Sequence, residues 1–288
     1  MSASPLRRHA ATLEMIRFSH TLFALPFAAA SALAAARGIP TGRVVLGILG
    51  AMVGARSAAM AFNRLADERF DRLNPRTASR HLPSGTLSRA YVWGFTVAAA
   101  ALFVASSAWL NRLCLLLSPI ALAWVLGYSY AKRFTAASHL WLGVGLGMAP
   151  VGAWCAVTGD LSRPAPWILG LAVALWTAGF DLLYACQDAE FDRKAGLHAI
   201  PARYGIPAAM RLARVLHLLA ILGLLGFVRL AGLGGISYGA VGGMALLLAW
   251  EHRLVKPDDL SKLDAAFFTL NAASSILIAA GVAVDVLR

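Results

Sequence analysis

Carboxylate and amide side chains recur at steps of four residues near the end of one apolar stretch. Asn63, Asp67 and Asp71 follow one another in this spacing, and Arg56 precedes them within the same stretch. On an α-helix, steps of three and four residues return to the same face. We therefore predict a helix that presents three oxygen-bearing side chains in a row, with an arginine deeper in the apolar segment.

A second polar row follows a later apolar stretch with a related spacing. Asp181 and Tyr184 precede Asp188 and Asp192, and on one continuous helix all four side chains would share a face. Both motifs contain two aspartates four residues apart, and both are followed by a basic tail that contains proline and glycine. This likeness predicts two loosely repeated halves.

Four carboxylates and one amide that converge from two helices suit a hard divalent cation. Two like charges at i and i+4 cost a helix about 0.2–0.5 kcal/mol, so such rows need compensation. Mg²⁺ takes oxygen ligands, often one or two carboxylates together with substrate phosphates, and Lys and Arg favour phosphate oxygens. We predict that the two rows bind Mg²⁺ and a diphosphate. Solvated helix ends paired with neighbouring bases are the alternative, and the repeated spacing argues against it.

The elements that must position these rows are long enough to cross a membrane. A spanning helix needs roughly 20 mostly apolar residues, and hydrophobic residues make up 59% of the 288 while charged residues make up only 14%. Because the runs are continuous and lack barrel alternation, we predict one all-α membrane domain over residues 1–288. Nine spans are expected, at residues 18–36, 44–63, 91–110, 112–130, 140–158, 166–185, 209–229, 232–250 and 265–287.

The distribution of Lys and Arg predicts the orientation of these spans. With the N-terminus in the cytoplasm, the cytoplasmic segments hold 19 Lys and Arg residues and the opposite side holds 6. Cytoplasmic loops carry the excess of positive charge, so both acidic motifs are expected in the cytoplasm and the C-terminus on the opposite side. A bacterial inner membrane is the expected location.

The same pattern argues against other classes of protein. The formal net charge is +12, but the bases fall in short clusters between apolar runs, so we do not expect a nucleic-acid partner. Cys114, Cys155 and Cys186 have no metal-ligand spacing and are odd in number, so neither a zinc site nor a disulfide framework is indicated.

Beyond these features, the chain resembles the UbiA-type intramembrane aromatic prenyltransferases. That family's first motif has the form Asn-x-x-x-Asp-x-x-x-Asp and its second Asp-x-x-x-Asp, as here. The likeness runs from about residue 15 to about residue 205 and extends to the nine-span count. Further matches are Arg76-Thr77, Leu82 to Gly85, Tyr128-x-x-x-Lys132-Arg133-x-Thr135, Tyr184-Ala185, Asp192-x-Lys194-x-Gly196 and Pro201 to Gly205.

The resemblance implies Mg²⁺-dependent transfer of a polyprenyl group from its diphosphate to an aromatic acid. Asp67 and Asp188 are expected to act in catalysis, and Asp181 falls where the family has a polar residue near the reacting carbons. We hypothesise that Asp181 orients or deprotonates the acceptor. The implied metal ligands are Asn63, Asp67, Asp71, Asp188 and Asp192, and the implied substrate contacts include Tyr128, Lys132, Arg133, Tyr184 and Lys194.

Two arginines and two histidines need separate interpretation. Arg17, at the start of the first span, either binds an acceptor carboxylate or anchors the span end. Arg56 is ionisable within a span, which favours a functional role at the substrate. His139 and His217 are lone histidines in apolar stretches, and we interpret them as packing residues.

The acceptor is less closely defined than the reaction. The best single prediction is 4-hydroxybenzoate in quinone biosynthesis, with a naphthoate of a menaquinone route as the alternative. Ser138-His139 stands where quinone-pathway members often have Pro-Gln, and His81 where the family often has proline. A cation-coupled secondary transporter is the rival from another class, although transporters place their acids near the bilayer midplane. Oligomeric state is not predicted.

Overall fold

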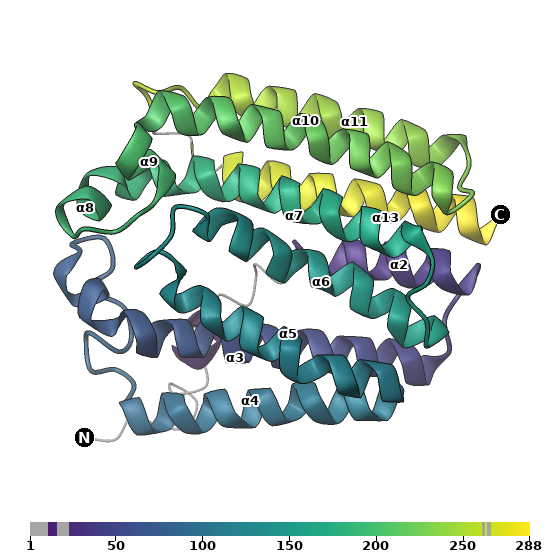
Figure 1. Cartoon of the computed structure of the whole chain (residues 1–288), viewed down its shortest axis with the longest axis horizontal. Helices are drawn as coiled ribbons and strands as arrows, with labels where there is room; N and C mark the ends of the chain where they lie inside the picture. The colour runs from purple at the N-terminus through teal and green to yellow at the C-terminus, as the bar shows by residue number, and fades with distance from the viewer. Residues whose placement is uncertain (1–10, 16–22, 261–262, 264–265) are drawn as a thin grey trace.

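The computed structural model describes residues 11–15, 23–260, 263 and 266–288. In this part of the chain the long elements are helices that lie side by side, with α10 and α11 at one edge, α4 at the other and α6 and α7 between them (Figure 1). The α-helices are α2 (Leu25–Ala36), α3 (Gly42–Leu73), α4 (Arg89–Leu110), α5 (Arg112–Ala131), α6 (Ser138–Thr158), α7 (Pro164–Ala185), α8 (Ala189–Lys194), α9 (Ile200–Tyr204), α10 (Ile206–Leu230), α11 (Gly235–Leu254) and α13 (Asn271–Leu287).

Among the described residues, seven helical stretches are long and apolar enough to cross a membrane. They match seven of the nine predicted spans, and the all-helical membrane bundle is confirmed. The two others are also helical where they are described: α2 has 12 residues, and the start of the span predicted at 18–36 lies outside the described residues. α11 has 20 residues, but its last turn contains Glu251, His252 and Arg253, and it is not among the seven.

The length of α3 explains how an apolar helix presents a polar row. Its 32 residues extend about 48 Å at 1.5 Å per residue, whereas the hydrocarbon layer is about 30 Å thick. Roughly 20 of its residues suffice to cross the layer, so the last turns extend past it. The loop that follows α3 lies at the same end of the bundle as α8 and α9, and the C-terminus lies at the other end (Figure 1).

Close backbone contact holds α6 against α7. A Cβ atom at Gly143 would lie 2.2 Å from the carbonyl oxygen of Ala174, and one at Gly147 would lie 2.3 Å from that of Gly170. Small residues at four-residue steps allow helices to approach this closely in membranes. Gly143 and Gly147 therefore lie where the two backbones meet, and the absence of side chains at these positions lets α6 pack directly on α7.

The helices differ greatly in how deeply they are buried. In the apolar stretch of α7 and its continuation, 72% of the residues are buried inside the protein, whereas in the apolar stretch of α5 only 11% are buried. Trp176 of α7 is fully buried against Phe27 and Phe180. The second acidic motif therefore leaves the best-packed helix of the bundle, and α5 forms a peripheral wall.

Candidate active site

A cavity of about 860 Å³ lies among α3, α5, α6 and α7. Its polar end brings together most of the residues that the sequence selected. Those that line it are Arg56, Asn63, Asp67, Asp71, Tyr128, Lys132, Arg133, Asp181, Tyr184, Asp188 and Asp192.

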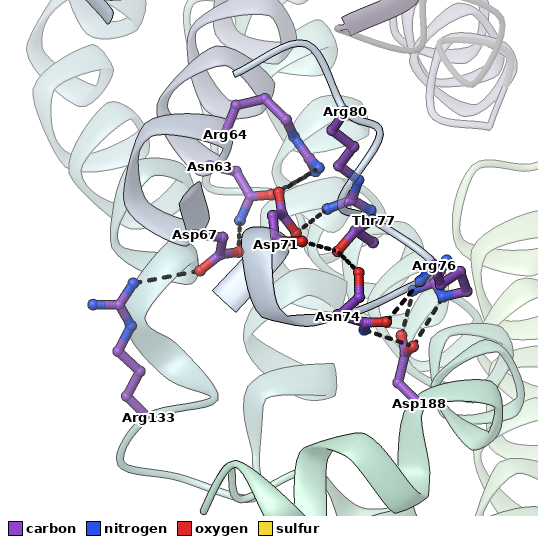
Figure 2. Close-up of polar contacts among 10 residues, drawn as sticks. All are labelled: Asn63, Arg64, Asp67, Asp71, Asn74, Arg76, Thr77, Arg80, Arg133 and Asp188. Atoms are coloured by element: carbon purple, nitrogen blue, oxygen red, sulfur yellow. Dashed lines mark hydrogen bonds and ion pairs between the residues drawn. The ribbon is translucent and has the colours of Figure 1, made fainter. Parts of the chain in front are cut away.

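The first motif forms a row on α3, as predicted. The Nδ2 atom of Asn63 donates a hydrogen bond to Oδ2 of Asp67 over 2.9 Å, one helical turn away. Arg64 donates from Nη2 to Oδ1 of Asn63 over 2.7 Å and lies with Nη1 3.4 Å from Oδ2 of Asp71. Figure 2 shows Arg64 and Arg80 both pointing at the Asp71 carboxylate.

The loop after α3 folds back onto its last turn. Arg80 donates from Nη1 to Oδ1 of Asp71 over 2.5 Å, and the hydroxyl of Thr77 donates to the carbonyl oxygen of Asp71 over 3.0 Å. Gly85 has a φ of 75°, a conformation that glycine adopts without steric cost. The loop is therefore held over the acidic row by contacts with the row itself.

Arg76 in this loop joins the first motif to the second. Its Nε donates to Oδ1 of Asp188 over 2.9 Å and its Nη2 donates to Oδ2, so the contact is bidentate (Figure 2). Asn74 Nδ2 lies 3.4 Å from the same Oδ1. Burial alone would lower the pKa of Arg76, but the hydrogen bond and charge of Asp188 outweigh it, so the pKa is raised. Residues 112 apart in sequence thus share one ion pair.

The second motif is bent, and the prediction of one continuous helical face is wrong. α7 ends at Ala185, a 3₁₀ turn covers Cys186–Asp188, and α8 begins at Ala189. Asp188 has φ −98° and ψ 4°, outside the α-helical range. Asp181, Asp188 and Asp192 nevertheless line the same cavity.

Two bases at the end of α5 complete the polar end. Lys132 Nζ lies 3.6 Å from Oδ2 of Asp192, and Arg133 Nη2 lies 3.4 Å from Oδ1 of Asp67. Arg133 also donates to the carbonyl oxygen of Ala66 over 2.6 Å. Each of the four motif aspartates therefore has a basic partner, supplied by Arg64, Arg76, Arg80, Lys132 and Arg133.

The chemistry of these donors fits Mg²⁺ shared with a phosphate ligand. In the described part of the chain, no cluster of three or more His, Cys, Asp or Glu side chains is arranged to hold a metal alone. Mg²⁺ commonly uses only one or two carboxylates and takes its other ligands from water and substrate phosphates. When Mg²⁺ and a phosphate ligand bind, the carboxylates can exchange their basic partners for the metal, and the bases can then contact the phosphate oxygens.

The remainder of the cavity is apolar and long. Ile48 and Met52 of α3 line it together with Phe103, Leu117 and Leu146 from the neighbouring helices. Ile48 precedes Asp67 by 19 residues, which corresponds to about 28 Å along the helix. A chain of that length with little polarity is the kind of ligand that such a channel accommodates.

Of the residues expected at the substrate, one lies elsewhere and one cannot be placed. Lys194 lies outside the cavity lining in the described structure, with its side chain 75% exposed and Nζ 2.7 Å from Glu190. Arg17 lies outside the described residues.

Five residues at the site were not selected from the sequence as site residues. Four of them lie next to the first motif or in its basic tail, and that proximity was the available signal: Arg64, Asn74, Arg76 and Arg80. His139 had no such signal: it is buried, as a packing residue would be, but it also contacts the site. Its Nδ1 lies 2.7 Å from Oδ2 of Asp181.

Fold and site together define the class: a helical membrane protein with acidic and basic rows at the polar end of a long apolar cavity. A model of the UbiA prenyltransferase family matches residues 24–273, so the chain belongs to that family and is a prenyltransferase. Among its relatives is 4-hydroxybenzoate octaprenyltransferase of Aeromonas salmonicida (strain A449), 31% identical over 77% of this chain and 76% of that one. The match to the Photobacterium profundum enzyme of the same name, at 32% identity, covers 59% of each chain.

Solved structures agree with this fold. A UbiA homologue from Aeropyrum pernix K1 is 38% identical, with a TM-score of 0.84 over 93% of this chain and 98% of that chain. A homologue from Archaeoglobus fulgidus, described as bound to GPP and Mg²⁺, matches with a TM-score of 0.70 over 95% and 99%. Its identity of 20% supports the fold alone.

Proposed function

We propose that this protein transfers a polyprenyl group from polyprenyl diphosphate to the ring of an aromatic acid, with Mg²⁺ as cofactor. The observation that carries the proposal is the convergence of two acidic rows and their bases at one end of a long apolar cavity. The diphosphate would occupy the charged end, and the isoprenoid tail would lie among the apolar side chains.

The charged end is suited to releasing a diphosphate. The ligands proposed for Mg²⁺ are Asn63, Asp67, Asp71, Asp188 and Asp192, and the bound metal would act as a Lewis acid on the leaving group. The chain's own bases, now paired with these acids, would turn to the phosphate oxygens and stabilise the charge that develops there. Lys132, with Tyr128 one turn before it, is well placed for this because both line the cavity.

The apolar walls protect the reacting carbon. As the C1–O bond breaks, its electron pair leaves with the diphosphate, and the allylic cation that remains would react with water if water were present. The aromatic ring forms the new carbon–carbon bond, and a base takes the proton released by the acceptor. Asp181 is the proposed base or orienting group, because it lines the cavity between the acidic rows and the apolar walls.

We propose 4-hydroxybenzoate as the acceptor, with a naphthoate as the alternative. The names of the relatives favour 4-hydroxybenzoate. His139 stands where quinone-pathway members of the family often have glutamine and contacts the proposed base, so both classes of acceptor belong in the test. We propose that the charged end faces the cytoplasm, as the excess of Lys and Arg on that side predicts.

Purified protein in lipid, with radiolabelled prenyl diphosphates and a panel of phenolic and naphthoic acids, tests the proposal. Reactions run with Mg²⁺ and with EDTA are compared with an Asp67→Ala/Asp188→Ala double variant. Asp160→Ala is the matched control, because Asp160 lies in an exposed loop and does not itself line the cavity.

A prenylated product that requires Mg²⁺ and both aspartates, and that Asp160→Ala still forms, supports the proposal and identifies the acceptor. If folded protein yields no product with any acceptor or chain length, prenyl transfer is refuted for this chain. Flux measurements for a cation-coupled transporter would then follow.

A further inference from the structure

His139 lies in the first turn of α6, directly behind the proposed base. Its side chain is 1% exposed and lies outside the cavity lining, whereas Asp181 lines the cavity. The two side chains come from different helices and meet with His139 Nδ1 2.7 Å from Asp181 Oδ2. The imidazole therefore reaches the cavity only through this carboxylate.

The surroundings decide which partner carries the proton between them. Among the residues that the structure describes, Nε2 of His139 is buried and has no hydrogen-bond partner. If Asp181 donated to Nδ1, a neutral imidazole would carry its proton on Nε2 and bury a donor without an acceptor, which is costly. A proton on Nδ1 leaves an unpaired acceptor at Nε2 instead, which is better tolerated than an unpaired N–H, and lets the imidazole donate to Oδ2 of Asp181.

We propose that His139 is a positioning residue for the proposed prenyl transfer: by donating from Nδ1, it holds the Asp181 carboxylate aimed into the cavity. Oδ2 is engaged by the imidazole, so Oδ1 is the oxygen left for the acceptor. This inference rests on the proposed function and adds a residue to it. The arrangement resembles the pairing in which a carboxylate orients a catalytic imidazole, with the two roles exchanged.

The proton balance of the step follows from this arrangement. The ring forms its bond to C1 of the allylic cation and loses one proton, from the attacked carbon or from its hydroxyl. Asp181 accepts that proton on Oδ1 while its hydrogen bond from His139 is retained, and no oxidant or reductant takes part. The proton then leaves by way of the charged end of the cavity.

The packing of α6 on α7 supports a positioning role. Gly143, one turn after His139, touches the backbone of Ala174 on the helix that carries Asp181. Ser138, beside His139, is fully buried. Since both helices are in close contact here, the imidazole has little freedom to leave the carboxylate.

The test compares His139→Leu and His139→Asn with a matched control, His217→Gln, in the radiolabelled transfer assay. Leucine removes the hydrogen bond, while asparagine can place an N–H donor where Nδ1 of the imidazole lies. His217 is likewise buried and hydrogen-bonded, over 2.9 Å, but its partner His252 does not line the cavity. Should His139→Leu fail to fold, as shown by thermal unfolding, His139→Met replaces it, since its side chain also has no N–H donor.

We expect His139→Leu to lower kcat by about tenfold or more, the effect of losing a hydrogen bond to a charged group. The KM for prenyl diphosphate stays unchanged, because the charged end is intact. His139→Asn recovers most of the activity, and His217→Gln is like the wild type. In an Asp181→Asn background, His139→Leu adds nothing further, since it acts only through the carboxylate.

Three results would overturn the inference while leaving the proposed function in place. These are a wild-type kcat in His139→Leu, an equal loss in His217→Gln, and full multiplication of the two effects in the double variant. Absence of product from the wild-type protein would instead refute the proposed function itself. The two failures are therefore distinguishable in one set of assays.

Discussion

Replacing Gly143 with alanine tests how closely α6 and α7 must approach for the site to work. A Cβ atom at this position would lie 2.2 Å from the carbonyl oxygen of Ala174, whereas ordinary contacts begin near 3.4 Å. The neighbouring atom belongs to the backbone, so the helices have to separate by about 1 Å. The hydrogen bond of 2.7 Å between His139 and Asp181 then stretches beyond the range of a hydrogen bond.

The expected cost has two parts. Overpacking costs about 1–3 kcal/mol, and alanine recovers about 1 kcal/mol of helix propensity relative to glycine. We therefore expect the free energy of unfolding to fall by about 0–2 kcal/mol. Turnover should fall more steeply, by about tenfold or more, because a hydrogen bond to a charged group is lost.

The assay combines thermal unfolding in detergent with prenyl transfer in lipid. Gly242→Ala is the matched control, because Gly242 lies within α11 with no atom within 4 Å of an added Cβ. This control should be as stable as the wild type or slightly more stable, with unchanged turnover. If Gly143→Ala retained both the wild-type melting temperature and the wild-type kcat, the argument from helix approach would be refuted.

The remaining predictions concern the bases. Arg76→Gln breaks a bidentate contact between the two motifs, so the KM for prenyl diphosphate should rise by about tenfold or more; Arg72→Gln, at an arginine 64% exposed, should leave it unchanged. Equal effects of the two variants would show that this contact is unimportant. Lys132→Ala should lower kcat by about a hundredfold, because charge on the leaving group loses a stabilising cation. Lys194→Ala should have wild-type kinetics, because its ammonium group lies outside the cavity; a large loss would place it at the substrate after all.

How far the site follows from sequence differs between the two motifs. On α3 the predicted row is present, because steps of four residues on an uninterrupted helix place Asn63 and Asp67 in contact. The same argument fails for the second motif, where the helix ends at Ala185 and a 3₁₀ turn intervenes. No local pattern in that segment indicated the bend. It follows from the packing of the segment, and it carries the last aspartate to Lys132.

Lys194 and His139 show the limits of inference from position in sequence. Lys194 matches a family motif, yet α8 directs it toward Glu190 and solvent. His139 matches no motif, yet it contacts Asp181 across the interface of two helices. In both cases the contact that the side chain makes depends on which side of its helix is turned toward the neighbouring helices. The spacing of residues along the sequence does not define this.

The amino-acid sequence by itself determined that this is a helical membrane protein with two acidic rows of one chemical kind. Those features depend on hydrophobicity and on helical periodicity, which act over a few residues. Tertiary structure alone decided that Arg76 bridges to Asp188 and that His139 lies behind Asp181, because these partners are 112 and 42 residues apart. The second contact depends on how closely α6 packs on α7, which the glycines at their interface allow. The first depends on where the loop after α3 meets the 3₁₀ turn after α7.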